Sequence, residues 1–146
     1  MTIPVVLDTS ALDALARSDV DAIAPAEMVA VVTEDGGQVL IPEATLGVVR
    51  DRYAKDPFLM RELGELLTRR GVHVMALLPE QARFAAALAT SMPDVDPGSA
   101  AAFVLTLDVD GELQTYEPET ALIVLPGHMI NDLGASGDGP SDAWPT

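Results

Sequence analysis

Three carboxylate residues stand where an α/β protein usually carries its chemistry. Asp8 follows the short apolar run at residues 3–7, Asp96 precedes a proline at the start of a predicted helix, and Glu117 follows a later predicted strand. Carboxylate oxygens are preferred ligands of hard cations such as Mg²⁺ or Mn²⁺. A bound cation activates water and polarises phosphoryl oxygens. If the fold gathers them, Asp8, Asp96 and Glu117 are the expected catalytic and metal-binding residues.

Other common α/β chemistries lack their motifs. The sequence has no Gly-x-Gly-x-x-Gly after the first apolar run, no Gly-x-x-x-x-Gly-Lys-Ser/Thr loop and no Gly-x-Ser-x-Gly elbow. Ser10 stands where a phosphoaspartate phosphatase carries its second aspartate. There is no cysteine, and two histidines, His73 and His128, are too few for a convincing imidazole metal site. A carboxylate site is the chemistry that remains.

Each of these acids also has a purely structural interpretation. Asp8 and Asp96 suit the N-cap of a helix, Asp96 especially because Pro97 follows it. Glu117, followed by Pro118, suits an exposed turn. An acid directly after a buried strand is costly without a partner, which favours a functional role for Asp8 in particular.

The elements that must position these acids alternate along the chain. Short runs rich in apolar residues predict strands over residues 3–7, 38–41 and 72–77, and two further strands are expected near residues 113–116 and 121–125. Helical apolar spacing predicts helices between the first strands and before residue 113. This alternation predicts a three-layer α/β/α domain with a mostly parallel central sheet. In such sheets the working site lies beyond the carboxyl ends of the strands. We expect one domain over residues 1–131 and a disordered tail over residues 132–146, which lacks apolar periodicity.

The charge balance restricts the partners. Eight Lys and Arg face 23 Asp and Glu, a net charge of −15, so the chain repels RNA unless a cation or a basic partner intervenes. Arg50, Arg52 and Lys55 form a basic cluster that is predicted to be a solvated helix face. With no basic-then-apolar leader and no apolar run near the length of a membrane span, we expect a soluble, cytoplasmic protein without membrane association.

Several segments resemble the PIN-domain family, which includes ribonuclease toxins of bacterial toxin–antitoxin pairs. They are Val-Val-Leu-Asp-Thr-Ser-Ala-Leu at residues 5–12, Val-Leu-Ile-Pro with Thr-Leu at 39–46, Asp96 with the alanines at 100–102, and Leu-Gln-Thr-Tyr-Glu-Pro at 113–118. The resemblance spans residues 3–126. It implies a metal-dependent endoribonuclease that uses three or four acids around Mg²⁺ or Mn²⁺, an RNA substrate, an antitoxin-like partner and, often, a homodimer.

The family's acids are only partly present. Asp8 stands at the first acid position, and Glu117 stands where Asp is usual at the fourth. The second position is Val48, which cannot ligate a metal, and the third is Ser99, with Asp96 one turn earlier as a substitute. Two hypotheses remain open: a toxin-type Mg²⁺- or Mn²⁺-dependent endoribonuclease with a weakened acid set, or a catalytically inactive PIN-like binding module. A basic antitoxin-like partner would offset the net charge of −15, which otherwise repels RNA.

Overall fold

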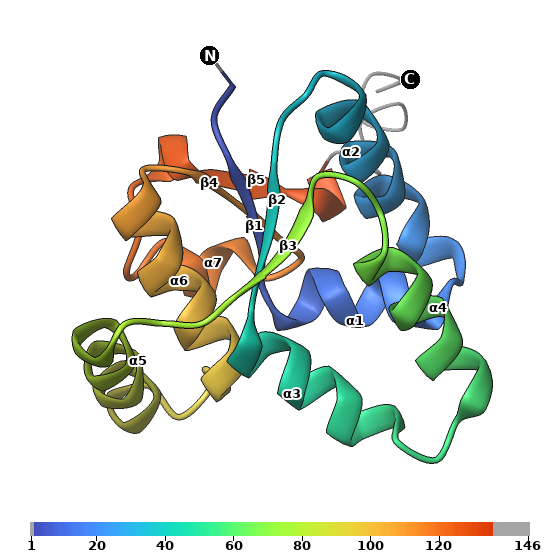
Figure 1. The fold of residues 1–146 in the computed structure, drawn as a ribbon. Coiled ribbons are helices and arrows are strands. Elements are labelled where there is room, and N and C mark those ends of the chain that lie inside the picture. Colours follow the sequence, from blue (N-terminus) through green and yellow to red (C-terminus); the bar gives the residue numbers. More distant parts are fainter. Residues whose placement is uncertain (1, 136–146) are drawn as a thin grey trace, which may run out of the picture.

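A computed structural model describes residues 2–135 of the chain, and Figure 1 shows its fold. In chain order the elements are β1 (Val5–Leu7), α1 (Thr9–Arg17), the 3₁₀ turn η1 (Val20–Ala22), α2 (Ile23–Glu34), β2 (Val39–Pro42), α3 (Glu43–Tyr53), α4 (Pro57–Leu67), β3 (Val72–Met75), α5 (Pro79–Ser91), α6 (Pro97–Val109), β4 (Glu112–Thr115), α7 (Pro118–Ala121), the 3₁₀ turn η2 (Gly127–Met129) and β5 (Ile130–Asp132).

The five strands form one parallel sheet in the order β3-β2-β1-β4-β5. Helices α1, α2 and α4 lie on one side of the sheet, and α5 and α6 lie on the other (Figure 1). The three-layer α/β/α architecture with a parallel central sheet, predicted from the alternation of strands and helices, is confirmed.

Helices cover both faces of the sheet (Figure 1). Successive residues of a central strand therefore point into two different cores, one on each face. Val5 and Leu7 of β1 pack into the core beneath α1, α2, α3 and α4, whereas Val6 between them packs into the core beneath α5 and α6. Phe103 of α6 is the largest buried side chain of this second core and is 1% exposed. This double burial explains why the central strands β1 and β2 are continuous apolar runs.

Polar residues next to prolines set the helix starts. The Asp56 carboxylate accepts a hydrogen bond from Leu59 N at 3.2 Å, with Pro57 as the first residue of α4. The predicted start of α6 at Asp96–Pro97 is also observed. Between α4 and β3 the chain turns at Gly71, whose φ of 88° lies in the left-handed region that favours glycine.

Two strand predictions need correction. Residues 121–125 are not a strand: α7 ends at Ala121, turns follow, and Leu122 and Ile123 are 54% and 72% exposed. The fifth strand is Ile130–Asp132 instead, which pairs with β4. The third strand also ends at Met75, two residues before the predicted Leu77. Pro118 starts a helical turn, and this local geometry overrides the β-favouring run that follows it.

The folded part extends beyond the predicted boundary after residue 131. Asp132 belongs to β5, and Leu133 is 1% exposed within the core beneath α1. The rest of the predicted tail, residues 136–146, lies outside the described residues. None of the helices within residues 2–135 is long and apolar enough to cross a membrane.

Candidate functional site

The parallel pairing of β1 with β4 brings the first and last predicted site acids to one edge of the sheet. Leu7 is opposite Gln114, so the residues that follow these two strands emerge side by side. The Asp8 amide donates to Gln114 O at 3.4 Å. This edge is the carboxyl end of the sheet, where ligands of parallel α/β proteins bind.

The Asp8 carboxylate is enclosed and already bonded. Asp8 is 1% exposed. Its Oδ1 accepts from Ser10 Oγ at 2.7 Å and from Ala11 N at 3.0 Å, and its Oδ2 accepts from Thr115 Oγ1 at 2.6 Å. Asp8 is thus the N-cap of α1 and also a bridge to β4.

Burial raises the pKa of the Asp8 carboxyl from 3.8 to about 6. The three hydrogen bonds favour the ionised form and oppose this rise, while the neighbouring Glu117 charge adds to it. Desolvation of the carboxylate therefore has a larger effect on the Asp8 pKa than its hydrogen bonds have. Asp8 is therefore a poorly solvated acid whose ionised form is destabilised by its surroundings.

The Ser10 and Thr115 hydroxyls fix the turn that carries Glu117. Besides donating to Asp8, Ser10 Oγ accepts from Tyr116 N at 3.0 Å, and Thr115 Oγ1 accepts from Glu117 N at 2.8 Å. Each hydroxyl therefore uses a donor and an acceptor function, which joins α1 to the residues after β4. Nothing in the local sequence reveals these roles of Ser10 and Thr115, because they join residues more than 100 positions apart.

Asp96 holds α6 against the start of α1. Its Oδ2 accepts from Gly98 N at 3.0 Å, from Ser99 N at 3.2 Å and from Thr9 Oγ1 at 2.6 Å. The N-cap interpretation of Asp96 is confirmed. Gly98 is essential to this approach, because a Cβ there would clash with Thr9 Oγ1 and lie 2.8 Å from the Thr45 Cα.

Glu117 is exposed and lines a pocket of about 420 Å³ at the carboxyl end of the sheet. The pocket is also lined by Ser10, Asp13, Arg17, Asp21, Arg52 and Tyr116. Unlike Asp8 and Asp96, the Glu117 side chain makes no helix-cap hydrogen bond, although it is the N-cap residue of α7.

A second network, centred on Asp13, occupies the same pocket. The Asp13 side chain is 12% exposed. Its Oδ1 accepts from Arg17 Nε at 2.8 Å and from Tyr53 Oη at 2.9 Å, and its Oδ2 accepts from Arg52 Nη1 at 2.8 Å. Arg52 is exposed, as predicted for a solvated helix face, with 47% of its side chain accessible, and it also reaches from α3 to a largely buried acid on α1.

The charge on Arg52 is stabilised from several directions. Its hydrogen bond to Asp13 raises the pKa of the Arg52 guanidinium, and the Asp13 and Asp96 charges reinforce this effect against partial desolvation. Burial, and then the hydrogen bond to Asp13, raises the pKa of the Tyr53 hydroxyl. A permanent cation thus lies within electrostatic reach of two acids, one of them a predicted metal ligand.

These residues do not fit a three-carboxylate metal centre. Within residues 2–135, no three Asp, Glu, His or Cys side chains form a group that could hold a metal ion, so Asp8, Asp96 and Glu117 do not make one together. Ser99, at the family's third acid position, is 3% exposed, and its hydroxyl has no hydrogen-bond partner among the described residues. The catalytic role of the three acids remains a prediction.

Comparison with known proteins identifies the fold. No protein-family model matches the chain, and no curated protein matches it in sequence. The crystal structure of VapBC2 from Rickettsia felis bound to a DNA fragment from their promoter contains a chain with a similar fold, at a TM-score of 0.67 and 10% sequence identity. The match covers 88% of this chain and 98% of that chain. The fold is PIN-like, as the resemblance predicted.

Proposed function

We propose that this chain is a PIN-like interaction module that binds a basic partner protein and does not rely on metal-dependent catalysis. The observation that carries the proposal is the state of Asp8, the first acid of the resemblance. Its carboxylate is buried and accepts three hydrogen bonds from the chain's own groups. Val48 and Ser99 replace two further acids, and Arg52 supplies a cation to the pocket beside Glu117.

Helix α2 supplies an apolar surface for a partner. Its residues are apolar on nearly all sides, but among the described residues the helix fully buries only Pro25 and Val29, while Ala24, Met28 and Val32 are partly buried against the core. Ile23 and Val31 are 56% and 58% exposed. A helix that is apolar all round is normally buried on all sides, so the outer face of α2 is suited to cover by another molecule.

A groove beside α2 continues this surface. It has a volume of about 210 Å³ and lies among α1, α2 and α4, with Leu15, Val29 and Leu66 among its apolar lining residues. Glu62 and Glu65 of α4 also line it. We call this groove together with the exposed face of α2 the α2–α4 surface.

The charges around the α2–α4 surface define the partner. Residues 18–38 contain five acids, at positions 19, 21, 27, 34 and 35, and no Lys or Arg. Arg17 pairs with two of them, Asp19 and Asp21, and Arg69 lines the groove beside Glu62 and Glu65, so acids outnumber cations around the surface. An apolar surface among acids fits an amphipathic helix that is apolar on one face and basic on the other. The similar chain was solved within a VapBC2 complex, which supports a function that depends on a bound partner.

Two synthetic helical peptides test this partner chemistry. One alternates a leucine face with a lysine face, and the other replaces every lysine by glutamate; both carry a fluorophore for anisotropy. We expect saturable binding of the lysine peptide, weakening with salt, and none of the glutamate peptide. Val31→Lys, and separately the pair Glu62→Lys and Glu65→Lys, should weaken binding about tenfold or more.

Val74→Lys, which adds the same charge to another exposed valine on β3, is the matched control and should leave peptide binding unchanged. Equal affinity for the two peptides would refute the assignment of a basic partner. Undiminished binding to Val31→Lys would show that the peptide does not bind to the α2–α4 surface.

A metal-dependent ribonuclease is the second candidate, and one observation favours it. Glu117 follows the strand next to the one that ends at Asp8, and its charge contributes to the raised pKa of the Asp8 carboxyl. Mg²⁺ is held in some proteins by one or two carboxylates with waters and substrate phosphates. Titration with Mn²⁺ together with an RNA-cleavage assay on the wild type and Asp8→Asn separates the two candidates.

A further inference from the structure

Strand β3 forms an open edge of the sheet. Within the described residues, β2 is its only neighbour. Val39 N of β2 donates to Gly71 O at 2.8 Å, so the carbonyl of the residue before β3 points toward β2. Because backbone groups alternate in direction along a strand, the N–H and C=O of Val74 point away from β2. No strand of the described chain lies on that side, so both groups of Val74 are available to another molecule.

The two edge strands of the sheet differ in how they are protected. Natural edge strands usually carry lysines, prolines, bulges or inward charges that prevent pairing with another chain. Strand β5, at the opposite edge, is Ile-Asn-Asp and ends in an acid, whereas β3 is Val-His-Val-Met, without proline, lysine or acid. Val74, Ala76 and Leu78 are exposed at alternate positions along β3 and the segment after it. The β3 edge is therefore suited to the addition of a strand from another chain.

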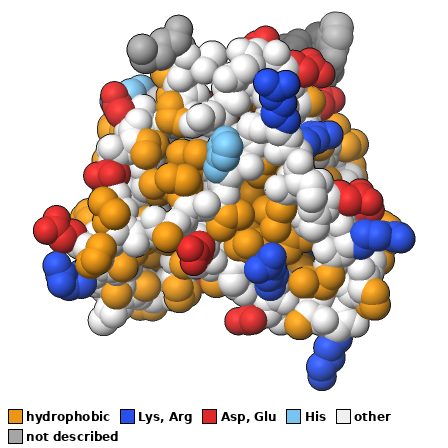
Figure 2. Space-filling view, viewed as in Figure 1, with side chains coloured by type: hydrophobic (Ala, Val, Ile, Leu, Met, Phe, Trp, Pro, Cys, Tyr) orange, Lys and Arg blue, Asp and Glu red, His pale blue; other side chains and the backbone are white. Residues whose placement is uncertain are grey.

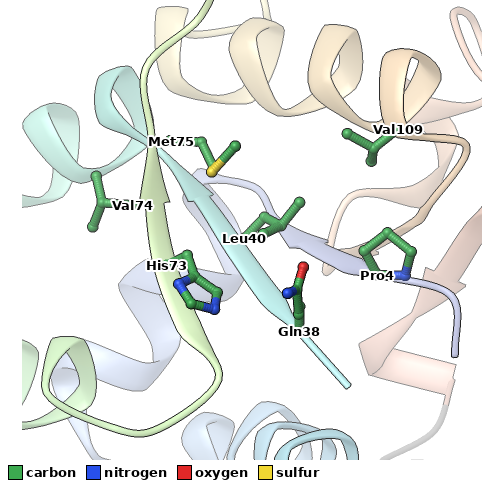
Figure 3. A pocket seen from close by; sticks show the side chains of 7 residues that line it. All are labelled: Pro4, Gln38, Leu40, His73, Val74, Met75 and Val109. Carbon is green, nitrogen blue, oxygen red and sulfur yellow. The ribbon is translucent and has the colours of Figure 1, made fainter. Parts of the chain in front are cut away.

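A pocket beside β3 can receive side chains of an added strand. It has a volume of about 450 Å³, and His73 and Met75 of β3 line it together with Leu40 and Val109. In Figure 3 Met75 and Val74 extend to opposite sides of β3. Neighbouring strands lie about 4.8 Å apart, so every second side chain of an added strand would lie beside His73 and Met75. Figure 2 shows hydrophobic side chains gathered on this face of the molecule.

The charges next to β3 favour an acidic segment. Residues 66–93 contain three arginines and a single acid, Glu80, in a protein of net charge −15. Arg69 shares the α2–α4 groove with two glutamates, but Arg70, directly before Gly71 and β3, takes part in no ion pair within the described part of the chain. At an ionic strength of about 0.1 M, charges more than about 10 Å away are largely screened. The cation at the start of β3 therefore attracts acids locally, although the chain as a whole is acidic.

We propose that β3 binds an extended segment of a partner protein as an added antiparallel strand, with apolar side chains at alternate positions and acids at its carboxyl end. Antiparallel pairing is the more stable per residue, and it brings the carboxyl end of the segment to Arg70. Hydrogen bonds to the outward backbone groups of β3 provide affinity, and the pocket and Arg70 select the segment. This partner segment is extended and acidic, whereas the α2–α4 surface fits a basic helix, so the inference does not depend on the proposed function.

Two synthetic strand peptides test the chemistry of the segment. Both alternate isoleucine with threonine over eight residues and carry a fluorophore at the amino end; one ends in two glutamates and the other in two lysines, with the carboxyl end amidated. Anisotropy is measured at about 0.15 M salt, with the chain varied from about 1 µM to about 500 µM. We expect saturable binding of the glutamate peptide and at least about tenfold weaker binding of the lysine peptide.

Methylation of the peptide backbone tests whether binding occurs by strand addition. Two further glutamate peptides carry N-methyl groups, one on every isoleucine and the other on every threonine. An added strand presents only one of these two sets of amides to β3. One methylated peptide should therefore bind at least about tenfold more weakly than the parent, and the other should bind like it. Equal effects of the two modifications would overturn the proposal.

Substitutions in the chain locate the binding site. Val74→Pro removes the outward N–H of β3, and proline is tolerated on an edge strand where that N–H faces solvent; it should weaken binding of the glutamate peptide at least about tenfold. Val74→Thr keeps the N–H and the branched shape and is the matched control. Arg70→Glu should weaken the glutamate peptide and strengthen the lysine peptide. Val31→Lys, on the α2–α4 surface, should leave both unchanged.

Three results would overturn the proposal. One is the absence of saturable binding of the glutamate peptide by the wild type. Another is binding that Val74→Pro does not weaken, when circular dichroism and thermal melting show that the variant is folded. The third is a dimer of the chain, seen by sedimentation velocity, that Val74→Pro dissociates, because a second copy would then occupy the edge.

Discussion

Replacement of Asp8 by asparagine should change how stability depends on pH. In the native chain the pKa of the Asp8 carboxyl is about 6, against an ordinary value of 3.8. Below pH 3.8 both the native and the unfolded chain hold this proton. Between the two values the unfolded chain releases it first, so the contribution of Asp8 to stability is lost as pH rises, and above pH 6 the loss is complete.

The magnitude follows from the difference between the two pKa values. At about 1.4 kcal/mol per pH unit, this difference corresponds to about 3 kcal/mol of unfolding free energy. Asp8→Asn removes the titration at this position. It also disturbs the hydrogen bond from Thr115, which costs about 1–3 kcal/mol at every pH. The pH-independent cost shifts the curve, whereas the titration changes its slope.

The assay is urea unfolding of both proteins by circular dichroism, between pH 4 and pH 7.5 with a chelator present. We expect the unfolding free energy of the wild type minus that of Asp8→Asn to fall by about 2.4 kcal/mol as pH rises through this range, because at pH 4 the unfolded chain has already released part of this proton. Glu119→Gln, which removes an exposed charge just beyond Glu117, is the control. A flat difference would refute the account of Asp8 as a desolvated acid, and a rising difference would indicate a carboxylate that the fold stabilises in its ionised form.

Three further substitutions test the packing around the site by thermal melting. Asp13→Ala removes the acceptor for two arginines and a tyrosine and should cost about 2 kcal/mol, less than a fully buried pair because the arginines are partly exposed; an unchanged melting temperature would contradict this. Ser99→Ala removes a buried hydroxyl without a partner among the described residues and should be neutral or stabilising, so a clear loss of stability would reveal an unseen partner. Gly98→Ala should destabilise by about 2 kcal/mol or more, because the added methyl meets Thr9 and the Thr45 backbone; a neutral result would show that α6 moves aside easily.

The parts of the fold that the sequence predicts well are those with strong local signals. The apolar runs of β1 and β2 and the Asp-Pro starts of α4 and α6 need no tertiary information. Strand β5 has no such signal, since it contains only one apolar residue, Ile130, and its strand form depends on pairing with β4. The fifth strand was predicted at residues 121–125 instead, because that segment is apolar.

The candidate site likewise contains residues with a local sequence signal and contacts that depend on tertiary packing. Asp8 and Asp96 are recognisable from their places before helices, and the pair Asp13 and Arg17 has the spacing of a helical ion pair. The contact of Arg52 with Asp13 joins residues 39 positions apart, and that of Thr115 with Asp8 joins residues 107 apart. Such contacts depend on how α3 and β4 pack against α1, and sequence spacing does not reveal them.

Calorimetric titration with Mn²⁺ tests the central claim most directly, with cleavage of a mixed RNA substrate assayed on the same samples. We predict no saturable heat with the wild type or with Asp8→Asn, and no cleavage that depends on the metal. Stoichiometric Mn²⁺ binding by the wild type that disappears in Asp8→Asn, accompanied by loss of RNA cleavage, would contradict the account and establish the chain as a metal-dependent ribonuclease.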